Sequence, residues 1–168
     1  ATNSFTVVLT EVNSAPVLPA QADRTITELT PLAVSNTATD ADLPANTLTY
    51  TLLAAPSGAS ISSSGIINWT PNESQGASTN TFITRVTDNG NPQLSATNSF
   101  DVVVLETNSA PVLPVQTNRT VFELATLTVT NTATDSDVPA NTLVYNLVAP
   151  PSGAAIDANG VISWTPTA

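Results

Sequence analysis

The chain has no cysteine, histidine, methionine or lysine among its 168 residues, and its only cations are three arginines. Without histidine and cysteine it lacks the commonest general base and the softest nucleophile. The same absences exclude zinc and iron sites built from nitrogen and sulfur ligands. Without cysteine there are no disulfides, so core packing, together with any bound metal, must hold the fold. We therefore expect a protein that is not an enzyme.

The charge balance also excludes classes of partner. Thirteen carboxylates against three arginines give a net charge of −10. Nucleic acid needs a basic footprint, and an anionic membrane surface attracts basic segments, so neither is an expected partner. No apolar run approaches the roughly 18 residues of a membrane span, and we expect no membrane insertion in this segment.

The sequence consists largely of short runs in which apolar and polar residues alternate. Residues 48–52 and 82–86 place apolar side chains on one face, and turn signals such as residues 88–92 separate the runs. No stretch has a sustained 3.6-residue period, so almost no helix is expected. About seven short strands in about 95 residues predict an all-β fold, an Ig-like Greek-key β-sandwich.

The sequence repeats itself with a period of 95 residues. Residues 1–73 align with 96–168 without a gap, and 46 of the 73 positions are identical. Such self-similarity predicts tandem modules. We assign residues 1–13 to the last strand of a preceding module, residues 14–108 to a complete sandwich, and residues 109–168 to a module that stops after its fifth strand and lacks its last two.

The alternating runs also predict the core of the complete module. Trp69 and its copy Trp164 lie on the apolar faces of their strands, which favours core filling over sugar stacking. The predicted core consists of Leu32, Val34, Ala38, Leu48, Tyr50, Leu52, Ile61, Ile67, Trp69, Phe82, Val86, Phe100, Val102 and Val104.

The incomplete module at residues 109–168 allows two interpretations. A sandwich that lacks two strands exposes sheet edges and core, so we expect the chain to be a piece of a longer array. The alternative is a filament subunit that assembles by β-strand exchange, in which residues 1–12 are the donated last strand. That donated strand cannot also supply the missing counterpart of the Phe82 strand.

The acidic residues recur at fixed places in the repeat. Asp40 and Asp42 return as Asp135 and Asp137. In extended chain, side chains two residues apart point the same way, so each pair can converge on one ion. Carboxylates that close repel, and Ca²⁺, which takes six to eight oxygen ligands, relieves the repulsion. The alternative is that these acids only cap turns and keep the surface soluble.

Several motifs together resemble a known family. They are Asn13-Ser14-Ala15-Pro16, the Asp-x-Asp-x-Pro-x-Asn segment at 40–46, the Trp-Thr-Pro segment at 69–71, and Val86-Thr87-Asp88. They resemble cadherin-like repeats, most of all the bacterial cadherin-like and Ig-type modules, including the dystroglycan-type variant. The resemblance covers essentially the whole chain. It implies a secreted bacterial protein, extracellular or at the cell surface, with Ca²⁺ at the junctions between modules.

The resemblance also implies which residues hold the ions. The first junction would use Glu11, Asn13, Asp40, Asp42 and Asp88. The second would use Glu28, Glu106, Asn108, Asp135 and Asp137, and Glu73 falls near a further acidic position of the family. The chain departs from the family where Ser14 and Ser109 replace an acidic ligand. We therefore expect one or two ions per junction, with an affinity on the order of 10⁻⁴–10⁻³ M.

These expectations give a leading function and an alternative. The leading one is a structural repeat in an extracellular rod, stalk or filament, with neighbouring copies of the module as its partners. The alternative is an adhesive module that binds glycan or a copy of itself and gains avidity from tandem display.

Overall fold

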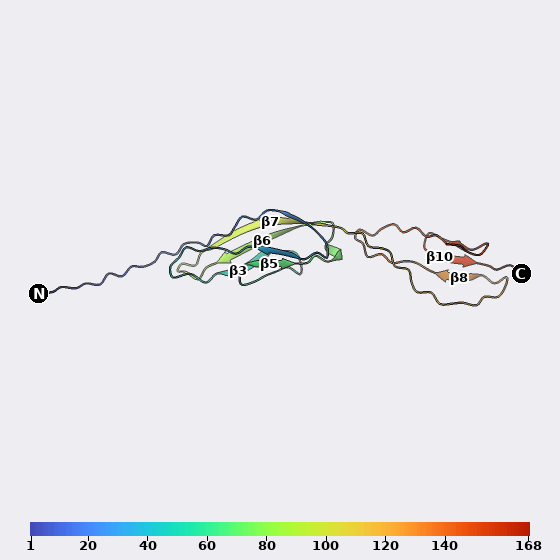
Figure 1. The fold of residues 1–168 in the computed structure, drawn as a ribbon, viewed down its shortest axis with the longest axis horizontal. Coiled ribbons are helices and arrows are strands. Elements are labelled where there is room, and N and C mark those ends of the chain that lie inside the picture. The colour runs from blue at the N-terminus through green and yellow to red at the C-terminus, as the bar shows by residue number, and fades with distance from the viewer. The chain divides into compact units, whose positions relative to one another are not determined.

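The computed structural model describes residues 1–168 as two units, residues 1–106 and residues 107–168 (Figure 1). Strands and irregular segments make up both units, and the one helix is a single 3₁₀ turn, η1, at Glu73–Gln75. No helix of the protein has the length and apolar character to cross a membrane. The predicted all-β class is confirmed.

The first unit is a sandwich of two sheets. In the first sheet β1 and β7 are parallel, while β7–β6 and β6–β3 are antiparallel. In the second sheet β5 pairs with β2 and β4, both antiparallel. The strands are β1 Arg24–Thr27, β2 Leu32–Ser35, β3 Thr49–Ala54, β4 Ser60–Ile61, β5 Ile66–Trp69, β6 Ser78–Thr87 and β7 Ser95–Leu105.

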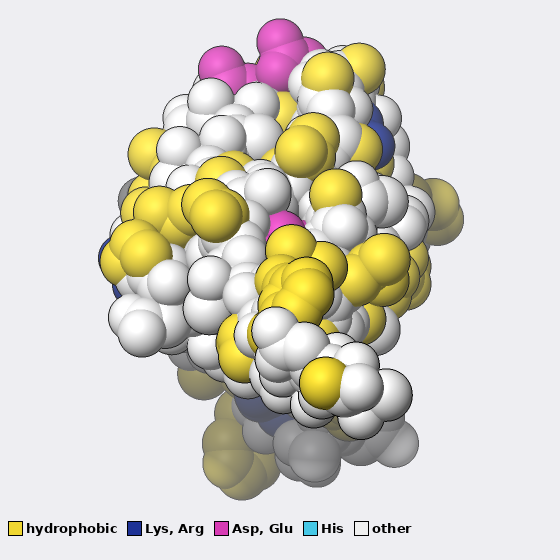
Figure 2. All heavy atoms as spheres, turned by 90° about the vertical axis from the view of Figure 1, so that its left-hand side faces the viewer, with side chains coloured by type: hydrophobic (Ala, Val, Ile, Leu, Met, Phe, Trp, Pro, Cys, Tyr) yellow, Lys and Arg dark blue, Asp and Glu magenta, His cyan; other side chains and the backbone are white.

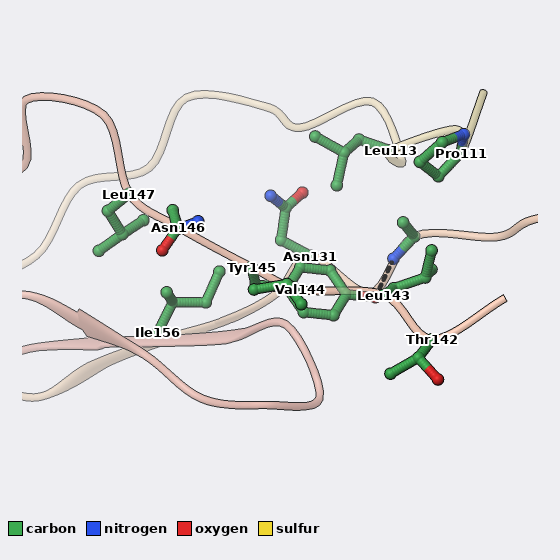
Figure 3. Close-up of a pocket in the computed structure, with 11 residues that line it drawn as sticks. Pro111, Leu113, Asn131, Thr142, Leu143, Val144, Tyr145, Asn146, Leu147 and Ile156 are labelled. Carbon is green, nitrogen blue, oxygen red and sulfur yellow. Dashed lines mark hydrogen bonds between the residues drawn. The ribbon is translucent and has the colours of Figure 1, made fainter.

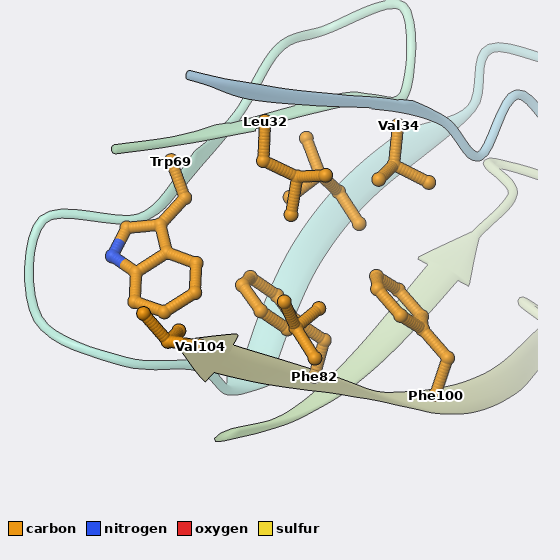
Figure 4. Packing of buried hydrophobic residues seen from close by; sticks show 8 residues of the cluster. Leu32, Val34, Trp69, Phe82, Phe100 and Val104 are labelled. Atoms are coloured by element: carbon orange, nitrogen blue, oxygen red, sulfur yellow. The ribbon is translucent and has the colours of Figure 1, made fainter. Parts of the chain in front are cut away.

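The core lies between the two sheets and follows from the alternation of apolar and polar residues along each strand. Phe82 of β6 stacks on Phe100 of β7, with ring centroids 5.1 Å apart, and meets the edge of Trp69 at 5.6 Å. Figure 4 shows Trp69, Leu32 and Val34 on one side of this core and the two phenylalanines on the other. Aromatic pairs of this kind stabilise a core beyond the area that they bury.

Most of the predicted core is buried and the rest is half-buried. Leu48, Tyr50, Leu52 and Ile61 keep part of their surface exposed. Tyr50 lies on edge strand β3, and its hydroxyl oxygen accepts a hydrogen bond from Ala38 N (2.8 Å). The buried members are Leu32, Val34, Ala38, Ile67, Trp69, Phe82, Val86, Phe100, Val102 and Val104.

The second unit forms a counterpart of only one of the first unit's two sheets, the β2-β5-β4 sheet. Its strands are β8 Leu127–Thr130, β9 Ala155–Ile156 and β10 Val161–Trp164, in the order β8-β10-β9. Each lies 95 residues after its counterpart in the β2-β5-β4 sheet. The sequence predicts five strands here, but residues 119–122 and 144–149, the counterparts of β1 and β3, form no ladder. The reason is that β1 pairs only with β7 and β3 only with β6.

Residues 1–12 are exposed throughout and belong to no strand. Their assignment to the last strand of a preceding module stays a prediction. Of the two tryptophans, Trp69 is buried as predicted, whereas Trp164 is half-buried because the second sheet that would cover it has no strand in this unit. Both indole N–H groups still donate to equivalent carbonyls, of Ser57 (3.2 Å) and Ser152 (3.1 Å).

Candidate metal centres

One acidic group of the first unit is built around the turn between β6 and β7. Asp88 follows β6 and is only 1% exposed. Its carboxylate accepts hydrogen bonds from the backbone N–H of Leu94 (2.9 Å) and Gly90 (3.1 Å) and from Asn13 Nδ2 (2.9 Å). Asn13 Nδ2 also donates to the carbonyl of Pro92 (2.9 Å). The structure thus places the predicted residues Asn13 and Asp88 side by side.

The Asp40–Asp42 turn belongs to the same group. Ser14 N donates to both carboxylate oxygens of Asp42 (3.1 Å each), and Asp42 N donates to Asp40 Oδ1 (3.1 Å). Asn46 Nδ2 bridges Asp42 Oδ2 (2.7 Å) and Asn13 Oδ1 (2.8 Å). Asp40 Oδ2 is buried without a hydrogen-bond partner. Buried polar atoms are nearly always paired, so this oxygen is a candidate cation ligand.

The electrostatics of this group differ between its members. Desolvation raises the pKa of Glu11 above its ordinary value, and the carboxylates of Asp42 and Asp40 raise it further. Burial also acts to raise the pKa of Asp88, but the hydrogen bonds from Leu94, Asn13 and Gly90 outweigh it and hold that pKa below its ordinary value. A cation beside Glu11 would offset the repulsion that it shares with the two aspartates.

A second acidic group lies at the other end of β7. Glu28 directly follows β1, Glu106 directly follows β7, and Glu73 begins η1. Because β1 and β7 are parallel, their ends coincide, and Glu28 N donates to the carbonyl of Leu105 (3.0 Å). One carboxylate oxygen from each of the three glutamates lies within 4.8 Å of the other two. This spacing suits three ligands of one hard cation.

Gly76 makes room for these carboxylates. A Cβ atom at this position would collide with Glu28 Oε2 and Glu106 Oε2. Its backbone has φ −62° and ψ 162°, a conformation open to any residue. Glycine therefore matters here for space rather than for backbone freedom: the glutamate oxygens occupy the space that it leaves, and a larger residue would make these carboxylates shift.

The second unit repeats the first acidic group 95 residues later. Ser109 N donates to Asp137 Oδ1 (2.9 Å), and Asp137 N donates to Asp135 Oδ1 (3.1 Å). Asn141 Nδ2 bridges Asp137 Oδ2 and Asn108 Oδ1. Asp88 has no counterpart within residues 107–168, and here Asn108 Nδ2 donates to the carbonyl of Ser109 (3.2 Å) instead.

The predicted ligand sets and the observed groups differ in two ways. Glu28 and Glu106 lie in the first unit, whereas Asn108, Asp135 and Asp137 lie in the second, so the predicted second junction draws on two units. The ligand sets predicted from the sequence do not include Asn46, and Glu73 is predicted only to fall near a further acidic position of the family. The Asp-x-Asp-x-Pro-x-Asn motif contains Asn46 and could have identified it. Glu73 is positioned by the 3₁₀ turn, which has no periodic signal.

All of these candidate ligands are oxygens of carboxylates or amides, and the set contains no nitrogen or sulfur ligand. Oxygen-only sites of this kind bind Ca²⁺ or Mg²⁺. Three to five such groups from turns and strand ends fit the irregular coordination of Ca²⁺ better than the strict octahedron of Mg²⁺. The residues present therefore fit a calcium ion at each acidic group of the first unit.

Comparisons with known proteins agree with this fold. Human CDH23 EC21-23 is similar at 25% identity with a TM-score of 0.51, over 89% of this chain and 51% of that one. Mouse Cadherin-23 EC22-24 is similar at 22% identity with a TM-score of 0.48, over 93% and 55% of the two chains. This chain therefore spans about half the length of these structures. A search of curated proteins finds no match.

The family comparison covers nearly all of the first unit's sandwich. The model of the family described as "Bacterial Ig domain" matches residues 13–103, which is more than half of the chain. That range runs from Asn13 in the first acidic group into β7, and includes β1 to β6 and all but the last two residues of β7. The chain belongs to the bacterial Ig domain family.

Proposed function

We propose that this chain is a non-enzymatic structural module of an extracellular bacterial protein, with Ca²⁺ bound by the acidic groups of its sandwich. Bacterial Ig and cadherin-like domains are typically extracellular and typically have no enzymatic activity. The observation that supports the metal is the convergence of Glu28, Glu73 and Glu106, whose carboxylate oxygens lie within 4.8 Å of one another.

The positions of the two acidic groups support a role at the ends of the module. Asp88 precedes β7 and Glu106 follows it, and an 11-residue strand is about 35 Å long. The Asp88 group and the Glu28 group therefore lie at opposite ends of one sandwich. A module with an ion at each end would resist bending where it joins its neighbours, which is the property that a stalk or rod requires.

Calcium-dependent melting tests the proposal. An ion that binds the folded chain stabilises it by RT ln(1 + [L]/Kd), about 1.4 kcal/mol at a tenfold excess over Kd. For a unit of this size that corresponds to a rise in Tm of roughly 6–11 °C. We expect this rise when Ca²⁺ replaces chelator, with an affinity on the order of 10⁻⁴–10⁻³ M.

A matched pair of variants makes the test specific. Glu28→Gln removes one of the three converging carboxylates and should reduce the calcium-dependent rise in Tm. Glu123→Gln, at the same repeat position in the second unit, removes an exposed carboxylate and should leave the rise unchanged. An equal Tm in Ca²⁺ and chelator for the unaltered chain would contradict the metal-binding role.

The adhesive alternative has less support. A glycan-binding face needs exposed aromatic side chains on which sugars can stack. Trp69, Phe82 and Phe100 lie inside the sandwich of the first unit. The exposed Phe5 and Phe122 lie in different units and belong to no strand, so they form no shared stacking face. Binding of the 168-residue chain to a glycan array would restore this alternative.

A further inference from the structure

The side chain of Asn13 lies in a recess beside the turn that joins β6 to β7. Its Nδ2 donates to Asp88 Oδ2 (2.9 Å) and to the carbonyl of Pro92 (2.9 Å). Its Oδ1 accepts a hydrogen bond from Asn46 Nδ2 (2.8 Å). Both hydrogens of the amide nitrogen and one lone pair of the amide oxygen therefore have partners, and all of these partners belong to the same sandwich.

Gly90 forms one wall of this recess. A Cβ atom at position 90 would collide with Oδ1 and Cγ of Asn13. The backbone of Gly90 lies outside the left-handed region, so other residues could adopt its conformation. Its N–H donates to Asp88 Oδ1 (3.1 Å), which fixes the turn around the recess. The missing side chain at position 90 therefore makes room for the Asn13 amide.

The orientation of the Asn13 amide follows from the chemistry of its partners. The carbonyl of Pro92 and the carboxylate of Asp88 can only accept hydrogen bonds, so the atom of Asn13 that faces both must be the nitrogen. The oxygen faces Asn46, whose nitrogen also donates to Asp42 Oδ2 (2.7 Å). Turning the amide over would set its oxygen against two acceptors. Asn13 therefore cannot offer this oxygen to a cation at Asp88 without losing two hydrogen bonds.

The backbone that follows Asn13 is also bound to the sandwich. Ser14 N donates to both carboxylate oxygens of Asp42 (3.1 Å each). Val17 N donates to the carbonyl of Thr39 (2.8 Å), and Thr39 N donates to the carbonyl of Val17 (3.0 Å). The segment at residues 13–17 is thus held through one side chain and through its backbone, and every one of these bonds joins two groups of the protein.

We infer that Asn13 fixes the chain where it enters the sandwich, through an entry clamp of Asn13, Asp88, Pro92 and Asn46 that needs no metal ion. The amide nitrogen of Asn13 takes the place beside Asp88 Oδ2 that a cation would otherwise occupy. A calcium ion is left with the Asp40 side of the group, where Asp40 Oδ2 is buried without a hydrogen-bond partner. The predicted ligand set therefore divides into residues that hold the chain and residues that face the ion.

The second unit repeats part of the entry clamp. Asn141 Nδ2 donates to Asn108 Oδ1 (3.0 Å), as the two residues 95 positions earlier do. Pro111 and Thr142 lie a few residues beyond the two ends of this bond. They line one pocket of the second unit and lie at the same end of it in Figure 3. The amide contact therefore belongs to the repeat and is not peculiar to the first unit.

Burial gives the entry clamp its energetic weight. Asp88 is 1% exposed and Asp42 is 6% exposed, and Asn13 is half-buried. On the face of the molecule drawn in Figure 2, acidic side chains occupy only small patches. A buried acceptor that loses its donor pays the full cost of its desolvation. Removal of the Asn13 amide would leave Asp88 Oδ2 in that state, so the entry clamp should stabilise the first unit as well as fix the chain.

Backbone relaxation of the 168-residue chain in chelator tests the inference. We expect residue 13 to have an NMR order parameter near 0.85, the value of rigid backbone. Asn13→Ala should lower it below about 0.6, whereas Asn68→Ala, at an exposed position of β5, should leave it unchanged. A residue 13 that is flexible in chelator and becomes rigid only when Ca²⁺ is added would overturn the inference, as would an unchanged value in Asn13→Ala.

A double-mutant cycle tests the recess itself. Asn13→Ala removes the amide, and Gly90→Ala adds the Cβ atom that collides with it. Each change alone should lower the Tm in chelator by roughly 4–8 °C. The two changes together should cost no more than Asn13→Ala alone, because the new Cβ then enters the space that the amide has left. Additive losses would show that Gly90 does not act through Asn13 and would refute the recess.

Melting in Ca²⁺ and in chelator separates the entry clamp from metal binding. The fall in Tm that Asn13→Ala causes should be the same in both conditions, because the Asn13 bonds involve no ion. A fall that occurs only in Ca²⁺ would identify Asn13 as a metal ligand and overturn the inference. The entry clamp does not rest on the calcium proposal. A chain whose Tm does not respond to Ca²⁺ would contradict that proposal and leave the results in chelator unaffected.

Discussion

The two units have the same residue at 38 of their 62 shared positions but form different amounts of sheet. The β2-β5-β4 sheet of the first unit is repeated by β8-β10-β9 in the second, whereas the β1-β7-β6-β3 sheet has no counterpart there. The hydrogen bond from Ala38 N to the Tyr50 hydroxyl (2.8 Å) recurs between Ala133 and Tyr145 (2.9 Å). Local contacts therefore survive in the second unit while ladders that need β6 or β7 do not.

This difference shows that strand propensity is not sufficient for a strand. Residues 48–52 and 143–147 have almost the same apolar pattern, yet only the first forms part of a ladder. A strand is stabilised by its cross-strand pairs, and β3 pairs with β6 over most of its length. The following predictions use pairs of matched residues to test how far the two units differ.

The largest expected effect is that of Phe82→Ala. Phe82 is fully buried, contacts both Trp69 and Phe100, and has no counterpart in the second unit. The cavity should cost the first unit about 3–5 kcal/mol. Phe122→Ala, at a residue 84% exposed, should change the free energy of unfolding by less than about 0.5 kcal/mol.

Fluorescence can assign that loss to one unit, because Trp69 and Trp164 lie in different units. Urea unfolding followed in a Trp164→Phe background reports the first unit, and in a Trp69→Phe background the second. A similar loss in both backgrounds would mean that the two units unfold together, which would contradict their separation.

A smaller effect is expected at the buried amide pair. Asn36 is 0% exposed and exchanges two hydrogen bonds with Asn98. Asn36→Ala leaves the Asn98 amide without that partner and should destabilise the first unit by about 1–3 kcal/mol. Asn131→Ala, at the matched position in the second unit, should cost far less, because Asn131 is only half-buried. Comparable losses for the two variants in urea unfolding would contradict this difference.

Gly76→Ala should act on the metal rather than on the fold. The backbone accepts alanine, but the new Cβ would displace the carboxylates of Glu28 and Glu106. We expect Ca²⁺ affinity to fall about tenfold, equivalent to about 1.4 kcal/mol, with little change of Tm in chelator. Isothermal titration with Ca²⁺ measures the first quantity and thermal melting the second. An unchanged Ca²⁺ affinity would contradict calcium binding by the glutamate group.

The smallest effect is a pH dependence at Asp88, a residue with no counterpart among residues 107–168. Hydrogen bonds hold the pKa of Asp88 below its ordinary value. The unfolded carboxyl therefore binds its proton first, and the stability that Asp88 contributes is complete above about pH 3.9 and is lost as the pH falls through the lower folded pKa. The difference in urea midpoint between the unaltered chain and Asp88→Asn should shrink as the pH is lowered over this range. A constant difference would contradict the assignment.

The sequence predicts the fold of the first unit more completely than that of the second. Alternation alone identifies Phe82, Val102 and Val104 as core residues, since strand side chains alternate between faces. Residues 119–122 and 144–149 form no ladder because their partners would be counterparts of β7 and β6, which lie far along the sequence. A local sequence pattern does not report such partners.

The candidate site was predictable in part for a similar reason. Asp40, Asp42 and Asn13 stand in a motif, and their recurrence 95 residues later marks them. Glu28 and Glu106 also recur, but their meeting follows from the parallel register of β1 and β7. Glu73 joins them through a 3₁₀ turn, and Gly76 matters only through the space beside it; neither contribution has a sequence pattern.

The parallel pairing of β1 and β7 has a mechanical consequence. These are the first and last strands of the first unit, and four residue pairs join them, from Arg24 and Val102 to Thr27 and Leu105. A force that pulls the two ends of the unit apart along the strands draws β1 and β7 in opposite directions. Their hydrogen bonds are then loaded together in shear instead of opening one at a time. The unit should therefore resist extension most strongly along its own length, the direction in which a load-bearing chain is pulled.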